Sequence, residues 1–246
     1  AAMAAGIASG FITAILQTKM GINSLLAGII VNTGLYSINI AVMSGSSILN
    51  INKTDTVFTK MAALVKGTPV ARQSKLFVAI IAVAAVAVIL GLFLKTRLGL
   101  AIRATGDNPD MVRSSSVNPA FTTIIGLCVA NSFTALSGCL LAQSQRSVNI
   151  DIGTGMVTIA LASLLIGGVF LGRKKMPLRI FGMVLGAFIF RLIYTIALRF
   201  DMPAFMLKFV SSVIVIAAIA TPYFKKQLPL LKRRIQTRSG RRKADA

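Results

Sequence analysis

The chain alternates between long apolar stretches and short polar connections along its whole length. A helix needs about 20 consecutive apolar residues to cross the hydrocarbon core of a bilayer. Seven stretches are close enough to this length to be predicted as spans: residues 1–17, 22–43, 76–94, 121–142, 156–171, 178–198 and 205–220. The pattern therefore predicts an all-α, polytopic integral membrane protein with about seven transmembrane helices.

The longest polar stretch in the middle of the chain, Lys95 to Pro119, is called the polar interval below. Inside it, Asn108 can cap a helix, Pro109 suits the first helical position, and Asp110 suits the positive end of the helix dipole. Residues 114–118 should end this short helix, and Asn118-Pro119 repeats the cap and proline before the next span. We expect a loop, then a short helix outside the membrane, then re-entry.

Three other segments carry local signals. The first span is rich in Gly, Ala and Ser, the small residues that let transmembrane helices approach closely. In the connection formed by residues 44–75, residues 54–65 have the pattern of a surface amphipathic helix, which Gly67-Thr68-Pro69 should end. The connection at residues 143–155 is expected to be a polar turn.

Composition supports a membrane protein and adds a basic tail. Of 246 residues, 55% are hydrophobic and 13% charged, with a mean hydropathy of +0.80, whereas soluble domains have about 25% charged residues. The net charge of +21 comes from 27 Lys and Arg against six Asp. Nine of the bases lie in residues 225–243, which favours contact with an anionic membrane surface over nucleic-acid binding. We expect a membrane domain at 1–222 and a cytoplasmic tail at 223–246.

The sequence opens inside an apolar run, with no initiator Met and no charged region before it. We therefore expect at least one further helix upstream of residue 1.

The distribution of bases predicts the orientation. With the tail in the cytoplasm, alternation through seven spans places Lys19, the polar interval and the basic loop 172–177 inside as well. The outer connections 143–155 and 199–203 then carry one base each, as the positive-inside rule expects. The connection 44–75 is the exception, since it carries several bases and would lie outside. The opposite orientation would misplace four basic segments instead of one.

Polar residues inside the spans are the candidates for chemistry. Arg191 is an intramembrane base that can meet a substrate carboxylate, or can pair within the helix bundle. Asn32, Asn39, Asn131 and Ser132 can line a path for a polar solute, or can form hydrogen bonds between helices. In the polar interval, the acids and bases are not arranged around a nucleophile, and no His, Glu or Cys lies nearby. We predict no catalytic residue and no metal site in the chain.

Four stretches of the chain resemble the permease subunits of ATP-driven (ABC) importers of the branched-chain amino acid and ribose type: residues 25–43, 96–118, 126–167 and 178–220. The most specific is TRLGLAIRATGDNPDMVRSSSVN, which in that family contains the coupling helix that docks in a groove of the ATPase. The resemblance implies an ATPase-coupling role for Gly99, Leu100, Arg103, Ala104, Gly106, Asn108, Pro109 and Arg113. Val112 stands where the family pattern has a small Ala.

The resemblance also implies partners: a second permease copy, a cytoplasmic ABC ATPase and an extracytoplasmic substrate-binding lipoprotein. The outer loop would meet this binding protein through Arg146 and Asp151, although solvent exposure alone explains the same residues. The chain has no phosphate-binding G-x-x-x-x-G-K-[ST] motif. We therefore expect no cofactor in this chain, with ATP and Mg²⁺ held by the ATPase, and no enzymatic activity of its own.

Two segments, LYSINIAVM and NIDIGTGMVTIALASLLIG, are similar to the subgroup that serves tryptophan, tyrosine and related amino acids. That subgroup has an acidic residue where this chain has Gly168, so the substrate is left open between an amino acid, a sugar and a purine nucleoside. Two other classes compete. An ion-coupled secondary transporter should carry midplane acids, and the chain has no Glu. A membrane scaffold would need no capped cytoplasmic helix. We therefore expect a multi-pass importer permease of the bacterial cytoplasmic membrane.

Overall fold

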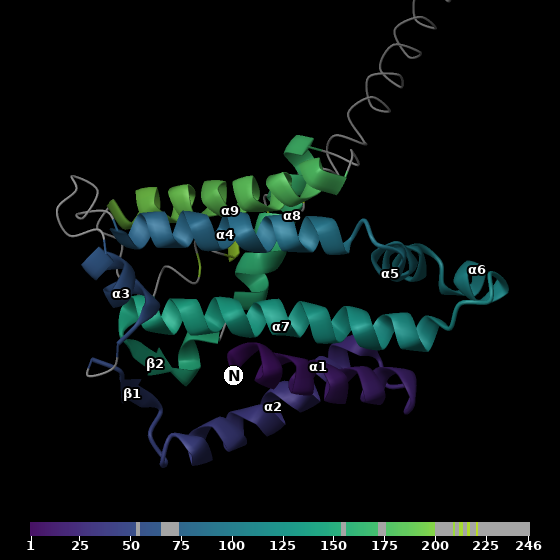
Figure 1. Cartoon of the computed structure of the whole chain (residues 1–246), viewed down its shortest axis with the longest axis horizontal. Helices are drawn as coiled ribbons and strands as arrows, with labels where there is room; N and C mark the ends of the chain where they lie inside the picture. The colour runs from purple at the N-terminus through teal and green to yellow at the C-terminus, as the bar shows by residue number, and fades with distance from the viewer. Residues whose placement is uncertain are drawn as a thin grey trace, which may run out of the picture. The chain divides into compact units, whose positions relative to one another are not determined.

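The computed structural model describes residues 1–52, 55–64, 74–153, 156–171 and 176–199, together with residues 209, 212, 213, 216 and 220. The chain divides into two compact units, residues 1–151 and 152–246. The first contains helices α1 to α7 and a small sheet, and the second contains α8 and α9. Figure 1 shows the course of the chain within each unit.

Helix α1 (Ala2–Thr18) packs along α7 (Pro119–Gln145) through a stripe of small residues. Gly6, Gly10 and Ala14 are spaced four residues apart and are all buried. A Cβ on Gly6 would lie 2.5 Å from the Asn131 carbonyl oxygen, and one on Gly10 would lie 2.7 Å from the Leu127 carbonyl oxygen. The two backbones therefore touch, and this close approach confirms the small-residue prediction.

Helix α2 (Ser24–Val42) lies on the other side of α1, as Figure 1 shows. Its N-cap is Asn23, whose side-chain oxygen accepts a hydrogen bond from the Leu25 N–H at 3.0 Å. Only Ala27 of α2 is buried. The rest of this apolar helix is thus left for lipid or for another protein surface.

A two-stranded antiparallel sheet joins two connections that are far apart in the sequence. Strand β1 (Ile48–Asn50) pairs with β2 (Ser147–Asn149), with Leu49 opposite Val148. Outside the ladder, the Ile51 N–H donates to the Arg146 carbonyl at 3.0 Å and the Ile150 N–H donates to the Ser47 carbonyl at 3.2 Å. The sheet places residues 48–50 of one connection and 147–149 of the other at one end of α7, as the predicted topology requires.

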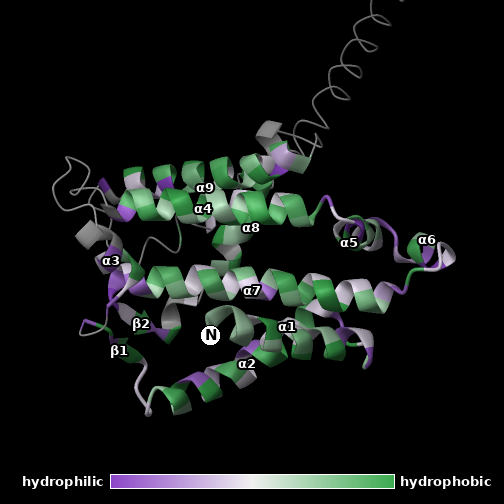
Figure 2. Ribbon diagram, viewed as in Figure 1, coloured by the Kyte–Doolittle hydropathy of each residue, from purple (hydrophilic) through white to green (hydrophobic). Residues whose placement is uncertain are grey.

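Helix α3 (Val57–Leu64) confirms the predicted amphipathic helix and packs against α4 (Ser74–Phe93). Its first turn is closed by Thr56 and Thr59, each of which bonds the backbone N–H of the other through its hydroxyl, at 3.2 and 2.8 Å. The Gln143 side-chain oxygen of α7 accepts a further bond from the Val57 N–H at 3.0 Å. After Ser74 and Lys75, α4 consists of apolar residues and glycine, as Figure 2 shows for the visible side, and this suits a lipid-facing span.

The Gln143 contact supports a testable prediction about α3. In Gln143→Ala the Val57 N–H loses its acceptor, a loss that costs about 0.5–1.5 kcal/mol for one hydrogen bond. Hydrogen exchange of the protein in lipid nanodiscs should show faster exchange in the first turn of α3 and no change in α5. The control is Gln145→Ala, an exposed glutamine on the same helix. Equal exchange in the two variants would show that Gln143 does not hold α3.

In the described part of the second unit, two helices pack closely. Helix α8 (Met156–Leu171) packs on α9 (Met176–Arg199) through glycines, since a Cβ on Gly167 would meet the Gly182 backbone and one on Gly186 would meet the Ser163 carbonyl. Ala162, Ile166 and Phe190 form the buried cluster beside this contact. Phe190 also stacks on Tyr194, with ring centroids 6.5 Å apart.

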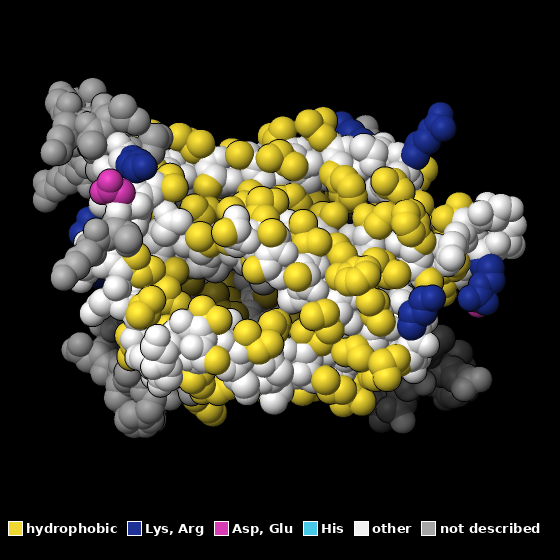
Figure 3. All heavy atoms as spheres, turned by 60° about the horizontal axis from the view of Figure 1, so that its bottom comes forward, with side chains coloured by type: hydrophobic (Ala, Val, Ile, Leu, Met, Phe, Trp, Pro, Cys, Tyr) yellow, Lys and Arg dark blue, Asp and Glu magenta, His cyan; other side chains and the backbone are white. Residues whose placement is uncertain are grey.

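Four described helices are long and apolar enough to cross a membrane: α2, α4 (from Lys75), α7 and α9 (to Ile196). Helix α1 and residues 159–168 of α8 are shorter apolar helices. Figure 3 shows apolar side chains over much of the visible surface. The mostly helical fold with several apolar spans confirms the polytopic membrane architecture. The predicted seventh span lies outside the described residues except at five positions, and the basic tail lies outside them entirely.

Candidate functional site

The polar interval forms two consecutive helices, α5 (Arg97–Asp107) and α6 (Pro109–Ser114). Asn108 caps α6, and its side-chain oxygen accepts bonds from the Asp110 and Met111 N–H groups at 3.1 and 3.2 Å. This confirms the predicted helix start at Pro109. The loop predicted before Asn108 was wrong, because residues 97–107 are helical and Asn108 is also the C-cap of α5.

The predicted end of the short helix is confirmed. Helix α6 stops at Ser114, and Ser116 takes a left-handed conformation with φ +60°. Asn118 then caps α7, accepting a bond from the Ala120 N–H at 3.0 Å, with Pro119 in the first turn. The polar interval is therefore a capped pair of helices.

Helix α5 is attached to the end of α4 by Thr96 and Gly99. The Thr96 hydroxyl donates to the Phe93 carbonyl at 2.6 Å and accepts a bond from the Gly99 N–H at 3.2 Å. Gly99 is buried, and a Cβ there would meet the Phe93 carbonyl oxygen and lie 2.5 Å from the Leu94 Cα. Only glycine fits this position, which gives a physical reason for the glycine that the family motif contains.

The C-terminal half of α5 contacts α7. Ile102 packs on Gly126, where a Cβ would lie 3.2 Å from the isoleucine methyl group. The hydroxyl oxygens of Thr105 and Thr122 lie 2.7 Å apart, and Thr122 is 1% exposed. A groove of about 580 Å³ runs beside this contact. Its wall comes from α5, from the start of α7 and, through Gln17 and Thr18, from the end of α1.

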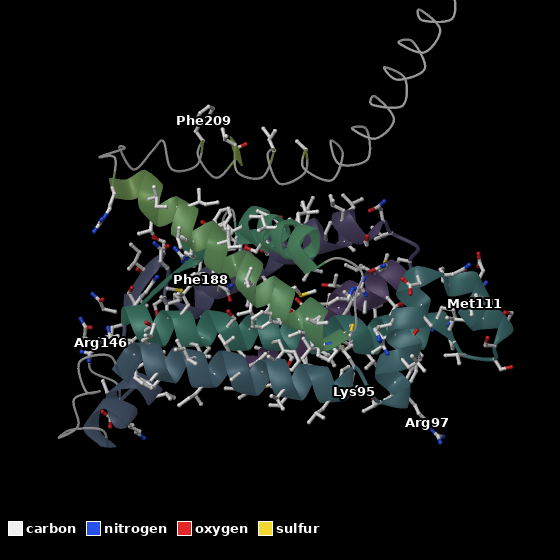
Figure 4. All side chains as sticks on the ribbon, turned by 90° about the horizontal axis from the view of Figure 1, so that it is seen from above. Lys95, Arg97, Met111, Arg146, Phe188 and Phe209 are labelled. Carbon is white, nitrogen blue, oxygen red and sulfur yellow. The ribbon has the colours of Figure 1, made fainter. Side chains whose placement is uncertain are left out.

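The free side of the two helices presents apolar side chains next to charged ones. Met111 is 63% exposed and Leu100 is 59% exposed, while Asp110 and Arg113 are exposed on α6. Figure 4 places Lys95, Arg97 and Met111 toward one end of the first unit and Arg146 at the opposite end. Val112 is 4% exposed, so its position is an internal packing site that suits a small apolar residue. Such a mixed surface outside the membrane is typical of a docking site.

Arg103 belongs to the middle of α5. Its side chain is half-buried, and within the described part of the chain its Nε has no hydrogen-bond partner. A buried donor without an acceptor costs free energy. Of the predicted coupling residues, Gly99 is buried, Arg103 and Ala104 are half-buried, and Leu100, Gly106, Asn108, Pro109 and Arg113 are exposed.

The candidate path residues lie in three separate places. Asn32 and Asn39 are exposed on α2. Asn131 faces α1, where its carbonyl oxygen and Cβ meet Gly6 and Gly10, and Ser132 is 4% exposed. Arg191 is exposed on α9 in the second unit. The first unit therefore does not bring its candidates into one cavity, and their role in a path stays a prediction.

The two candidate outer residues follow the end of α7. Arg146 has a left-handed backbone with φ +56° and an exposed side chain, and it precedes β2. Asp151 belongs to the short 3₁₀ helix Ile150–Gly153, and its side chain lies outside the described atoms. The polar turn predicted here is in fact the sheet strand and this helix. A contact with a binding protein stays a prediction.

Residues 1–219 match the family described as "Branched-chain amino acid transport system / permease component". The chain is 31% identical over 220 residues to the tyrosine transport system permease protein of Clostridioides difficile, covering 89% of this chain and 70% of that protein. It is 23% identical to the autoinducer 2 import system permease protein LsrC of Yersinia enterocolitica, over 89% of this chain and 58% of that protein.

An uncharacterized protein of Rickettsia prowazekii is 29% identical over 166 residues, 68% of this chain and 56% of that protein. The chain thus spans less than three fifths of two of these three relatives. No solved structure matches it.

Proposed function

The chain belongs to the permease components of branched-chain amino acid transport systems, a family of ABC importer permeases, and on this premise we propose that it is the membrane subunit through which a separate ATPase drives amino-acid import. Members of this family are parts of multi-component transport systems, and the family is not a catalytic one. The family and the apolar spans make the chain a multi-pass protein of the bacterial inner membrane. ATP and Mg²⁺ would bind to the ATPase.

The arrangement of the polar interval supports this proposal most. Helices α5 and α6 lie together at the N-terminal end of α7, and the β1–β2 sheet lies at the other end, as Figure 1 shows. The C-terminal end of α1 lies on the α5 side, where Gln17 and Thr18 face the same groove as Gly106. The two connections of the first unit that were predicted to be cytoplasmic are thus on one side, with the exposed Met111 and Leu100 available to an ATPase. The basic loop 172–177 lies outside the described residues except at its last two positions.

The exposed polar face of helix α2 supports the proposal of a second permease copy or of a polar path. Asn32 and Asn39 are seven residues apart, so they share one face of the helix, and both are exposed. Gly28 is on the same face and has nothing within 4 Å of its Cβ position. Amide side chains are costly in lipid. We propose that this face borders the path or the second copy, while the wholly apolar α4 faces lipid.

The proposal is tested by purifying the chain with its cytoplasmic ATPase and replacing Arg103 by alanine. Because half-buried Arg103 belongs to the helix pair that would dock, we expect ATP hydrolysis stimulated by the loaded binding protein to fall about tenfold, the effect of about 1.4 kcal/mol. Lys19→Ala is the control, an exposed base on the same side of the unit. If ATPase association and stimulated hydrolysis were both unchanged in Arg103→Ala and Gly106→Ala, the coupling role would be abandoned.

The amino-acid substrate is proposed from the 31% identity to the tyrosine transport system permease. The permease for autoinducer 2 is a relative at 23% identity, which keeps a non-amino-acid solute as the second candidate. The ligand that co-purifies with the partner binding protein distinguishes them. An amino acid supports the proposal, whereas a sugar or purine nucleoside would rule it out and leave the importer class intact.

A further inference from the structure

Thr105 of α5 and Thr122 of α7 join the two helices through their hydroxyl groups. The Thr105 hydroxyl lies 2.8 Å from the Ala101 carbonyl of its own helix, and the Thr122 hydroxyl lies 2.9 Å from the Pro119 carbonyl of its own helix. The two hydroxyl oxygens are also only 2.7 Å from each other. Two hydroxyl hydrogens are therefore available for three short contacts. One threonine must donate its hydrogen to the other threonine and so give up the bond to the carbonyl of its own helix.

Burial of Thr122 favours this contact. Thr122 is 1% exposed and is one of the two largest fully buried side chains of the described chain. A buried hydroxyl without a partner costs free energy, so the contact is favoured from the Thr122 side. Thr105 is half-buried and lines the groove.

We propose that Thr105 and Thr122 are positioning residues that make α5 and the start of α7 move as one body, so that displacement of the coupling helices reaches α7. This inference rests on the proposed function. On the other side of α5, Gly99 and Thr96 hold the end of α4. From α7 the displacement passes directly to α1, because the α1 and α7 backbones touch at Gly6 and Gly10.

A groove lies beside the pair. It is lined by Gly106 and Pro109 from the polar interval, by Thr123 and Leu127 from α7, and by Gln17 and Thr18 from α1. Next to this groove, the Thr105–Thr122 bond and the Ile102–Gly126 contact join α5 to α7, while α6 makes a smaller contact of its own with α7.

The test uses the full transporter, with its ATPase and binding protein, in liposomes, and measures uptake of radiolabelled L-tyrosine and ATP hydrolysis together. Thr105→Val and Thr122→Val replace a hydroxyl by a methyl group of similar size. Each should lower the uptake per ATP hydrolysed about fivefold, the effect of one hydrogen bond. The double variant should lose no more than either single variant, because the pair acts as a unit.

Thr123→Val is the matched control. The Thr123 hydroxyl donates to the same Pro119 carbonyl, at 2.8 Å, and lines the same groove. It should keep the wild-type ratio. Thr105→Ser, which retains the hydroxyl, should restore the ratio lost in Thr105→Val.

Several outcomes would overturn the proposal. They are an unchanged ratio in both valine variants, additive losses in the double variant, and a serine variant that behaves like valine. A merely structural role would lower uptake and hydrolysis in parallel and leave their ratio unchanged, which also counts against the proposal. If the wild-type transporter showed no ATP-dependent uptake of L-tyrosine or of the amino acid that co-purifies with its binding protein, the proposed function would fail instead.

Discussion

Gly6→Ala is expected to loosen α1 from α7 and to lower the thermal stability of the protein in detergent. The new Cβ would lie 2.5 Å from the Asn131 carbonyl oxygen and 2.7 Å from the Ala135 Cβ. Neither atom is the end of a flexible side chain, so the helices must move apart. Overpacking of this kind costs about 1–3 kcal/mol, which exceeds the gain of about 1 kcal/mol from replacing glycine by alanine in a helix.

The matched control is Gly138→Ala on α7. No atom lies within 4 Å of its Cβ position, so only the gain in helix propensity remains and the unfolding temperature should stay the same or rise. The unfolding temperatures of the two variants are compared by intrinsic or dye fluorescence of the purified protein. If Gly6→Ala were as stable as Gly138→Ala, the backbone contact between α1 and α7 would not contribute to stability.

Gly99→Ala is expected to displace α5 from the end of α4 and to uncouple the transporter. A Cβ at this position meets the Phe93 carbonyl oxygen and the Leu94 Cα, both backbone atoms. The N-terminal turn of α5 must therefore shift, at a cost of about 1–3 kcal/mol. With the coupling helices out of place, we expect stimulated ATP hydrolysis to fall about tenfold or more, measured with the reconstituted ATPase and binding protein.

Gly106→Ala tests the docking of α5 on the ATPase without disturbing the packing of α5 within the chain. Gly106 lies in the same helix, is exposed, and has nothing within 4 Å of its Cβ position. Its alanine variant should be as stable as the wild type, whereas Gly99→Ala should be less stable. A loss of stimulated hydrolysis in Gly106→Ala without a loss of stability would locate the ATPase at this turn. Full stability and full hydrolysis in Gly99→Ala would contradict the close contact with α4.

The sequence predicted best those features that depend on local chemistry. Apolar runs of sufficient length predicted the spans, and cap residues with a following proline predicted the starts of α6 and α7 to the residue. These signals are local because a cap bonds backbone groups only two or three positions away, as Asn108 and Asn118 do.

What was missed depends on contacts between distant residues. Helix α5 could have been predicted from Thr96, which caps it by accepting a bond from the Gly99 N–H, but the segment before Asn108 was expected to be a loop. Tertiary contact through Ile102 and Thr105 stabilises the helix in spite of that weak local preference. The pairing of Ile48–Asn50 with Ser147–Asn149 has no signal in either short strand. The grouping of Asn131 with α1 likewise depends on which helices become neighbours.

The β1–β2 sheet has a consequence for the order of assembly. Its strands are separated along the chain by α3 to α7, so they can meet only after α4 and α7 have both been inserted and have brought their ends to the same face of the bilayer. Pairing between segments so distant in sequence forms late, because the loop must close first. A chain in which either α4 or α7 failed to insert would leave the strands on opposite faces, so the sheet closes only when both of these spans are in place.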